Sequence, residues 1–260
     1  MNTPRTRVVL LGASNLSLGF PFVVERCLQL FGPDTDVRAA HGFGRSYGRW
    51  SNVAGPVREI PGLIESDVWK ALDEAPPVER SFALVTDVGN DVAFDRLPDQ
   101  IEPWVRTVLD RLEGHGARVL LTGLPVASVE SLSPFWFGVF KNLYFPGRKS
   151  TRQELIERAL EMDTRLVALT EERGHARFAP PGEWYGVDPI HIRLGTRRSA
   201  WREVLASWGE QPTAADFRLD PASWSRLKKN HPTRRRFFGR EQSFSQPRLQ
   251  LAEGGQVSLY

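Results

Sequence analysis

The stretch Val8-Val9-Leu10-Leu11-Gly12-Ala13-Ser14-Asn15 decides how the chain folds. Four apolar residues are followed at once by a glycine, which is typical of a buried strand that ends in a tight turn. The hydroxyl of Ser14 would then stand at the carboxyl edge of a sheet, where open α/β folds bind ligands. A serine at this position also suits the N-cap of a following helix, so the stretch alone assigns it no chemical role.

The rest of the chain alternates between short apolar runs and helical patterns, with a Gly-rich stretch over residues 41–62 that is predicted to be loop. Strands that alternate with helices imply an α/β fold with a mostly parallel sheet of about five strands, covered on both faces. The predicted strands are 8–11, 36–40, 82–86, 118–122 and 175–179, and the predicted helices are 17–31, 64–72, 98–114, 151–167 and 196–208.

The composition is that of an ordinary globular protein, since 41% of the 260 residues are hydrophobic and 25% are charged. Cys27 is the only cysteine, which excludes an intramolecular disulfide and a cysteine-based zinc site. No His or carboxylate group has metal-ligand spacing, so no metal is expected. No apolar run approaches the roughly 18–20 residues of a membrane helix, and the run after Arg7 is too short for a signal peptide. We therefore expect a soluble, cytoplasmic protein.

The charge is concentrated near the C-terminal end. Residues 1–208 hold 25 Lys+Arg and 26 Asp+Glu, whereas residues 209–260 hold 9 and 5. We therefore predict one domain over 1–208 and a basic extension over 209–260, partly disordered or packed on the domain. Residues 226–240 contain seven cations with Phe237 and Phe238 among them, a pattern that nucleic acid or another acidic partner could bind. A solvated extension is the favoured interpretation, because short basic runs are weak signals.

An aromatic segment follows the strand predicted over 118–122. Phe135, Trp136 and Phe137 are its most concentrated part, and a loop at the carboxyl end of a strand is a natural place for a pocket wall or a lid. These three residues, together with Asn15, are the candidates for a substrate pocket. Core packing or a contact between copies would explain the same composition.

Two further polar groups follow predicted strands. Gly89-Asn90-Asp91 comes after 82–86, where an asparagine amide could donate to an oxyanion. Asp188-Pro-Ile-His191 comes just before the last helix. Across such a turn a carboxylate can accept the Nδ1–H of the imidazole and leave Nε2 free to take a proton from a nucleophile. Each group by itself is also common in turns and caps.

In this order the groups resemble the motifs of the SGNH hydrolases, also called GDSL esterases. Gly12-Ala13-Ser14 is similar to the first block of that family, Gly44-Arg45-Ser46 to the second, Gly89-Asn90-Asp91 to the third, and Asp188 with His191 to the last. The resemblance covers about residues 8–208. It implies a three-layer α/β/α sandwich with a flavodoxin-like sheet. It also implies an esterase without a cofactor that acts on a small acyl or acetyl ester, with catalytic Ser14, Asp188 and His191 and oxyanion donors Gly44 and Asn90. Gly42 is the less favoured donor.

Two positions depart from the family pattern. Ala13 stands where the family has an aspartate before the serine, and Val88 stands where it has a glycine two residues before the asparagine. Neither change removes a catalytic atom, although both could alter loop geometry. The alternative to an esterase is an inactive scaffold of this family that binds a partner through its basic extension.

The segment from Gly42 to Gly48 contains two other patterns. Gly44-Arg-Ser46-Tyr-Gly48 matches the G-x-S-x-G of the α/β-hydrolase nucleophile elbow, but only two predicted strands precede Ser46, fewer than that fold requires. The glycines also give G-x-G-x-x-x-G, a loose dinucleotide pattern that lacks a convincing apolar helix after it. Both interpretations are therefore less favoured, and His41 beside them is expected to be structural rather than catalytic.

Overall fold

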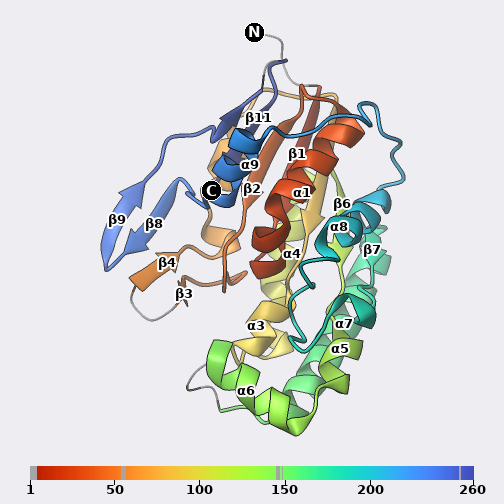
Figure 1. The fold of residues 1–260 in the computed structure, drawn as a ribbon, viewed down its shortest axis with the longest axis vertical. Coiled ribbons are helices and arrows are strands. Elements are labelled where there is room, and N and C mark those ends of the chain that lie inside the picture. Colours follow the sequence, from red (N-terminus) through yellow and green to blue (C-terminus); the bar gives the residue numbers. More distant parts are fainter. Residues whose placement is uncertain (1–4, 54–56, 145–146, 148, 252) are drawn as a thin grey trace.

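The computed structural model describes residues 5–260 apart from 54–56, 145–146, 148 and 252. Its centre is a seven-stranded sheet with the strand order β10-β11-β2-β1-β5-β6-β7, parallel throughout except between β10 and β11 (Figure 1). The strands are β1 (Thr6–Leu11), β2 (Asp36–Ala40), β5 (Arg80–Val85), β6 (Ala117–Thr122), β7 (Ala176–Phe178), β10 (Leu249–Gln250) and β11 (Gln256–Leu259).

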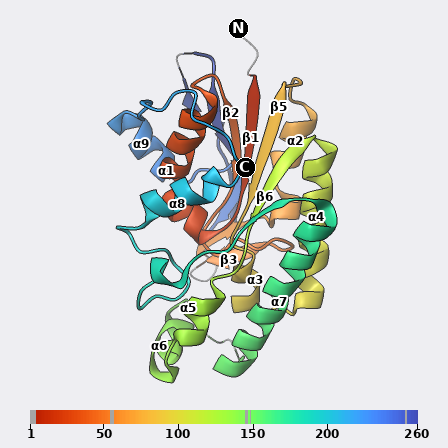
Figure 2. The same cartoon turned by 90° about the vertical axis from the view of Figure 1, so that its right-hand side faces the viewer.

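Helices cover both faces of this sheet, as Figure 2 shows. Side chains alternate along β1, so that Val8 and Leu10 belong to the core on one face, and Val9 and Leu11 to the core on the other. The first core is closed by α1 (Ser14–Phe31), α8 (Arg197–Ala206) and α9 (Pro221–Lys228), and the second by α2 (Val68–Asp73), α4 (Pro98–Gly114) and α7 (Arg152–Arg173).

Shorter helices gather at the carboxyl ends of the strands (Figure 1). The aromatic segment that was expected to be a loop instead forms the helix α6 (Pro134–Tyr144), and no described residue of this helix is buried. None of the described helices combines the length and the apolar character that a membrane span requires. These elements are α3 (Gly89–Ala93), α5 (Val126–Ser131) and α6 (Pro134–Tyr144), with single 3₁₀ turns at Leu63–Glu65 and Gly182–Trp184.

The predicted three-layer α/β/α architecture is confirmed, and the strands β2-β1-β5-β6-β7 have the flavodoxin-like order. Because β1 and β5 run side by side to the same edge, the chain turns very tightly after β1. A Cβ atom on Gly12 would lie 2.6 Å from Cγ2 of Thr86, so only glycine fits between the two strand ends. This turn places Ser14 at the carboxyl edge of the sheet.

The expected number of about five strands is wrong, because β10 and β11 both come from residues 209–260. Strand β11 lies parallel to β2, with Val257 opposite Val37, and both valines are fully buried. The sequence Gln256-Val-Ser-Leu259 is only four residues long and half polar. It therefore lacks the continuous apolar run that marks β1 and β6.

A second, antiparallel sheet with the order β3-β4-β8-β9 joins two distant parts of the chain. Residues 41–62, expected to be loop, contribute two of its strands. Strand β3 pairs with β4 and β8 pairs with β9 as local antiparallel neighbours, whereas β4 meets β8 across more than 170 residues. All four strands are only three or four residues long and mostly polar, so they lack the apolar alternation that predicts a strand. The strands are β3 (Ser51–Val53), β4 (Arg58–Ile60), β8 (Arg234–Phe237) and β9 (Arg240–Ser243).

The packing of β11 makes a prediction about stability. Leu259 is 1% exposed and belongs to the same core as α1 and α8. Replacing it by alanine is expected to lower the free energy of unfolding by about 2–5 kcal/mol, as for other buried leucines. Urea unfolding measures this loss. Leu160→Ala, at a position 41% exposed on α7, is the control and should change the value by less than about 0.5 kcal/mol. Equal effects of the two substitutions would contradict the placement of β11.

Candidate active site

Ser14 is the first residue of α1, and its hydroxyl does not cap that helix. The N-cap residue is Ala13, which supplies no side-chain hydrogen bond. The hydroxyl of Ser14 instead lies 2.9 Å from Nε2 of His191, which is 177 residues away in the sequence. The fold therefore directs this hydroxyl toward an imidazole rather than toward the backbone of its own helix.

Asp188 orients the other side of the same imidazole. Its Oδ2 lies 2.7 Å from Nδ1 of His191, while its Oδ1 accepts the backbone N–H groups of Ile190 and His191 at 3.1 and 3.2 Å. Burial would raise the pKa of Asp188, but hydrogen bonds and charge from His191, with the Ile190 N–H and Tyr144, hold it below its ordinary value. An ionised carboxylate only accepts, so Nδ1 carries the proton and Nε2 accepts from Ser14.

Tyr144, at the end of α6, adds a contact to this pair. Its hydroxyl donates to Oδ2 of Asp188 at 2.9 Å, and its ring meets the His191 ring edge to face, with the centroids 5.3 Å apart. Burial, together with the bond to Asp188, raises the pKa of Tyr144 to about 12, so the phenol stays protonated and remains a donor. Within the aromatic segment, nothing in the sequence distinguished this residue from its neighbours.

Asn15 holds the residues on both sides of His191. Its amide nitrogen donates to the carbonyl of Ile190 at 2.8 Å, and its amide oxygen accepts the N–H of Ile192 at 2.9 Å. The two bonds fix the backbone of the histidine loop against the start of α1. Asn15 also lines the cavity described below, but its amide is occupied by these backbone groups.

Asp87 links the start of α1 to the end of β5. Its carboxylate accepts the N–H of Ala13 at 2.8 Å, the N–H of Leu16 at 3.1 Å and the amide of Asn15 at 3.0 Å. It thus provides a carboxylate to the turn in which Ala13 replaces the aspartate of the SGNH pattern. Asp87 has a φ of 64°, a conformation that aspartate tolerates better than most residues. Asp87 was not among the predicted site residues, although a polar residue directly after a predicted strand was an available signal.

Asn90 approaches the segment that contains Gly44. Its amide nitrogen donates to the carbonyl of Arg45 at 3.0 Å, which leaves one of the two amide hydrogens for another acceptor. Gly44 has a φ of 65°, in the region that favours glycine. Asn90 is among the described residues that line the cavity at Ser14, and Gly44 is not.

Arg45 connects this segment to the last strand. It is fully buried, and its guanidinium donates to the backbone oxygens of Pro61 at 3.0 Å and Tyr260 at 2.6 Å. Tyr260 in turn donates its N–H to Ala39 at the end of β2. Residues after 209 thus support the backbone next to Gly44.

Ser46 and His41, the other candidates in this region, have different partners. The hydroxyl of Ser46 donates to Asp91 at 2.5 Å, and among the described residues no histidine is hydrogen-bonded to it. Nδ1 of His41 lies 2.8 Å from the Ser17 hydroxyl. Burial, with the charges of Arg45 and Arg58, lowers the pKa of His41 to about 3 and keeps it neutral. Neither residue is linked to Ser14 or His191 by a hydrogen bond.

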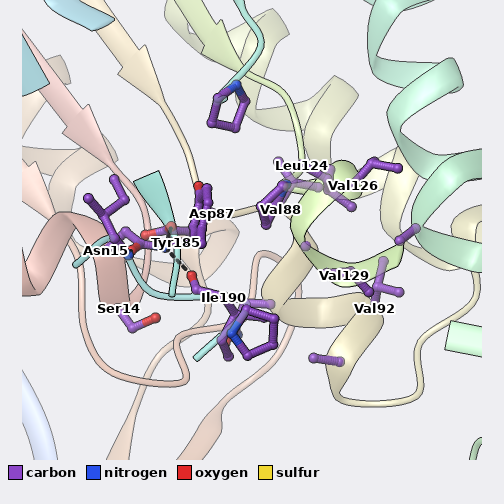
Figure 3. Close-up of a pocket in the computed structure, with 18 of the residues that line it drawn as sticks. Ser14, Asn15, Asp87, Val88, Val92, Leu124, Val126, Val129, Tyr185 and Ile190 are labelled. Atoms are coloured by element: carbon purple, nitrogen blue, oxygen red, sulfur yellow. Dashed lines mark hydrogen bonds between the residues drawn. The ribbon is translucent and has the colours of Figure 1, made fainter. Parts of the chain in front are cut away.

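A cavity of about 140 Å³ opens beside Ser14 (Figure 3). In the figure Ser14, Asn15 and Asp87 lie on one side, and the apolar side chains on the other. Of the aromatic candidates Phe137 lines the cavity, whereas Phe135 and Trp136 are 71% and 41% exposed and are not among the described lining residues. The apolar lining includes Val88, Val92, Leu124, Val126, Val129, Leu132, Phe137, Phe140 and Leu155.

The described side chains offer no evident place for a metal ion. Within the described part of the chain, no three His, Cys, Asp or Glu side chains gather in a ligand-like group. The polar groups at and around Ser14 are instead a hydroxyl, the imidazole of His191, the carboxylates of Asp87 and Asp188, and amides. This set can carry out proton transfer and nucleophilic attack.

Solved esterases have the same architecture. The carbohydrate acetylesterase Est24 of Sinorhizobium meliloti is similar to 78% of this chain over 98% of its own length, with a TM-score of 0.55 and 15% identity. An inhibitor-bound aryl esterase of M. smegmatis and a putative arylesterase of Agrobacterium tumefaciens each have a TM-score of 0.52 over the same shares of the two chains, at 17% and 15% identity. No protein-family model and no curated protein matches the sequence. At these identities the likeness shows the fold alone, which this chain shares with the solved esterases.

The buried carboxylate beside Ser46 makes a prediction about pH. Burial raises the pKa of Asp91 from 3.8 to about 6, against the opposing hydrogen bonds from Ser46 and Tyr47. The folded state therefore binds more protons than the unfolded state between these values, and its stability rises as the pH falls through 6. Asp91→Asn removes this effect. From pH 7 to about pH 4 the wild type should gain about 2 kcal/mol of unfolding free energy relative to the variant.

Urea unfolding at both pH values measures the difference. Asp216→Asn, which changes an exposed carboxylate with no histidine partner among the described residues, is the matched control. Its difference from the wild type should vary much less with pH. A constant difference between the wild type and Asp91→Asn would contradict the raised pKa.

Proposed function

We propose that the protein is a serine ester hydrolase that works through an acyl-enzyme. The observation that carries this proposal is the continuous pair of hydrogen bonds from Asp188 through His191 to Ser14, at the mouth of an apolar cavity. Nucleophile, base and orienting carboxylate each have the partner that a catalytic triad requires. The shared fold with solved esterases supports the same conclusion.

In the proposed reaction the Ser14 hydroxyl attacks the ester carbonyl while Nε2 of His191 accepts its proton. The imidazolium that forms is stabilised by the carboxylate of Asp188, and its proton passes to the departing alcohol. A water molecule then attacks the acyl-enzyme with His191 as the base and releases the acid. Tyr144 donates to Asp188 throughout and limits the movement of its carboxylate.

The oxyanion of the tetrahedral intermediate needs donors opposite His191. We assign this role to the N–H groups of Ser14 and Gly44 and to the free amide hydrogen of Asn90. The bond from Asn90 to the Arg45 carbonyl supports this assignment, because it orients the amide and links it to the Gly44 segment. Each such donor is typically worth about 10²–10³ in rate.

Asn15 and Asp87 are proposed as positioning residues rather than substrate contacts. Asn15 fixes the backbone on both sides of His191, and Asp87 fixes Asn15 and the turn before Ser14. The proposed catalytic groups all lie within residues 1–208. We propose that the remaining residues support this unit, through β11 and through the contact of Tyr260 with Arg45.

The cavity limits the part of the substrate that can be buried. Its volume of about 140 Å³ is close to the roughly 150 Å³ at which an apolar cavity accommodates benzene. Its lining is mostly apolar, so the buried group is a short acyl chain or a small ring. This size supports esters of small acyl groups.

The assignment of the nucleophile is tested by two serine substitutions. Ser14→Ala should lower kcat for p-nitrophenyl acetate by about 10⁴- to 10⁶-fold, the range for removal of a triad nucleophile. Ser46→Ala is the matched control and should retain most of the activity at a temperature where it is folded, as checked by circular dichroism. Hydrolysis that survives Ser14→Ala and disappears in Ser46→Ala would assign the nucleophile to Ser46. A wild type without turnover on any ester would favour a binding protein.

The size of the cavity is tested with p-nitrophenyl esters of increasing acyl length. We expect kcat/KM to peak at or below about six carbon atoms and to fall for longer chains, which must leave the cavity. Val129→Ala shortens a side chain in the apolar wall and so enlarges the cavity. It should move the optimal acyl length toward longer chains. An optimum that lies at long chains in the wild type, unchanged in Val129→Ala, would contradict this use of the cavity.

A further inference from the structure

Strands β8 and β9 of the second sheet, with the residues beside them, form a strongly basic surface. None of the residues proposed for the triad belongs to it. Residues 226–248 contain eight Lys and Arg but only one Glu. The hairpin of β8 and β9 stands away from the central sheet in Figure 1. We call the following residues the hairpin surface: Lys229, Arg235, Phe237, Phe238, Arg240 and Arg248.

The cations of the hairpin surface have little compensation from acidic groups. Arg234 and Arg236 nearby form ion pairs with Asp67 and Glu59, at 3.5 and 3.8 Å. By contrast, none of the four cations of the hairpin surface forms an ion pair with a described residue. Burial lowers the pKa of the neighbouring His231, and Arg235, Arg248, Arg58 and Lys229 lower it further. This part of the molecule therefore carries a positive potential that an anionic partner would neutralise.

The turn of the hairpin is apolar and exposed. Phe237 and Phe238 are 38% and 65% exposed, and their rings meet edge to face, with the centroids 4.8 Å apart. Two phenylalanines at the tip of a projecting hairpin have no core to enter within the described chain. The unfavourable free energy of exposing the two rings to water is removed when the tip enters an apolar medium.

The other aromatic rings near the hairpin surface are already covered. Phe244 is stacked on His231 with a centroid distance of 4.5 Å and lies under the guanidinium of Arg235 at 4.8 Å. Trp50 lies under Arg236 at 4.4 Å. Single-stranded nucleic acid needs open ring faces on which successive bases stack. Because Phe244 and Trp50 are covered and only Phe237 and Phe238 at the tip are exposed, a lipid surface is favoured over a nucleic acid as the partner.

We propose that the hairpin surface docks the protein on membranes rich in anionic lipids. Lys229, Arg235, Arg240 and the neighbouring cations would lie against the headgroup phosphates, and Phe237 and Phe238 would enter the interface between headgroups and acyl chains. Basic residues near an anionic bilayer and aromatic residues at its interface both add to such binding. The surface contains none of the residues proposed for catalysis, so the two functions can be lost separately.

The test is co-sedimentation of the full chain with vesicles. Vesicles of phosphatidylcholine alone are compared with vesicles that contain about one third phosphatidylglycerol, a strongly anionic surface. The wild type should bind the anionic vesicles and release them as the salt concentration rises. Lys229→Gln with Arg240→Gln should lower the partition coefficient about 30-fold, at about fivefold for each charge. Phe238→Ser should lower it about tenfold.

Matched controls lie outside the hairpin surface. Lys70→Gln removes an exposed charge on α2, and Leu160→Ser removes an exposed apolar side chain on α7; both should bind vesicles like the wild type. Hydrolysis of a soluble ester should be unchanged in all variants. Equal binding to neutral vesicles, equal losses in the control variants, or retention of a single-stranded oligonucleotide without vesicle binding would each overturn the proposal.

Discussion

The arrangement of the candidate site depends on the carboxylate of Asp87. It accepts the N–H of Ala13 before α1, the N–H of Leu16 in the first turn of α1 and the amide of Asn15, while Asn15 binds the backbone on both sides of His191. One acceptor thus joins the first strand, the third strand of the flavodoxin-like order and the histidine loop. Oδ2 of Asp87 and the amide nitrogen of Asn15 each bind two partners, so the network couples these three segments to one another. The distance from His191 to Ser14 follows from it.

A second set of contacts links the last residue, Tyr260, through Arg45 to Asn90 at the cavity. The guanidinium of Arg45 is held by the backbone of Pro61 and Tyr260, and its own carbonyl receives the amide of Asn90. A buried guanidinium with backbone partners is costly to move, because any lost bond leaves a donor without water. The part of the chain that looked like an appended basic extension is therefore structurally coupled to the segment beside Asn90.

The sequence was most informative where the signal was local. The run Val8–Leu11 and the helix over 98–114 have the expected periodicity, so the central strands and the three-layer architecture could be predicted. The order of Ser14, Asn90, Asp188 and His191 pointed to groups that the fold does bring to one edge. Strands β3, β4, β8 and β9 were missed because each is three or four residues long and mostly polar, and β11 was missed because its partner β2 is distant in sequence. Tyr144 was missed because no spacing encodes its contacts with Asp188 and His191, whereas the position of Asp87 directly after a predicted strand was an available signal.

The position of β11 also has a consequence for how the sheet is assembled. Strand β2 occupies an interior place only after Gln256–Leu259 has joined it, and the two strands are separated by more than 200 residues. Until then β2 is an open edge whose unpaired backbone groups can recruit a strand from another molecule. In the finished sheet the edge strand on this side is β10, which is only two residues long and antiparallel to β11. The last strands thus protect the sheet against pairing with a strand from another molecule. Chains in which these strands have not yet formed are the most exposed to such aggregation.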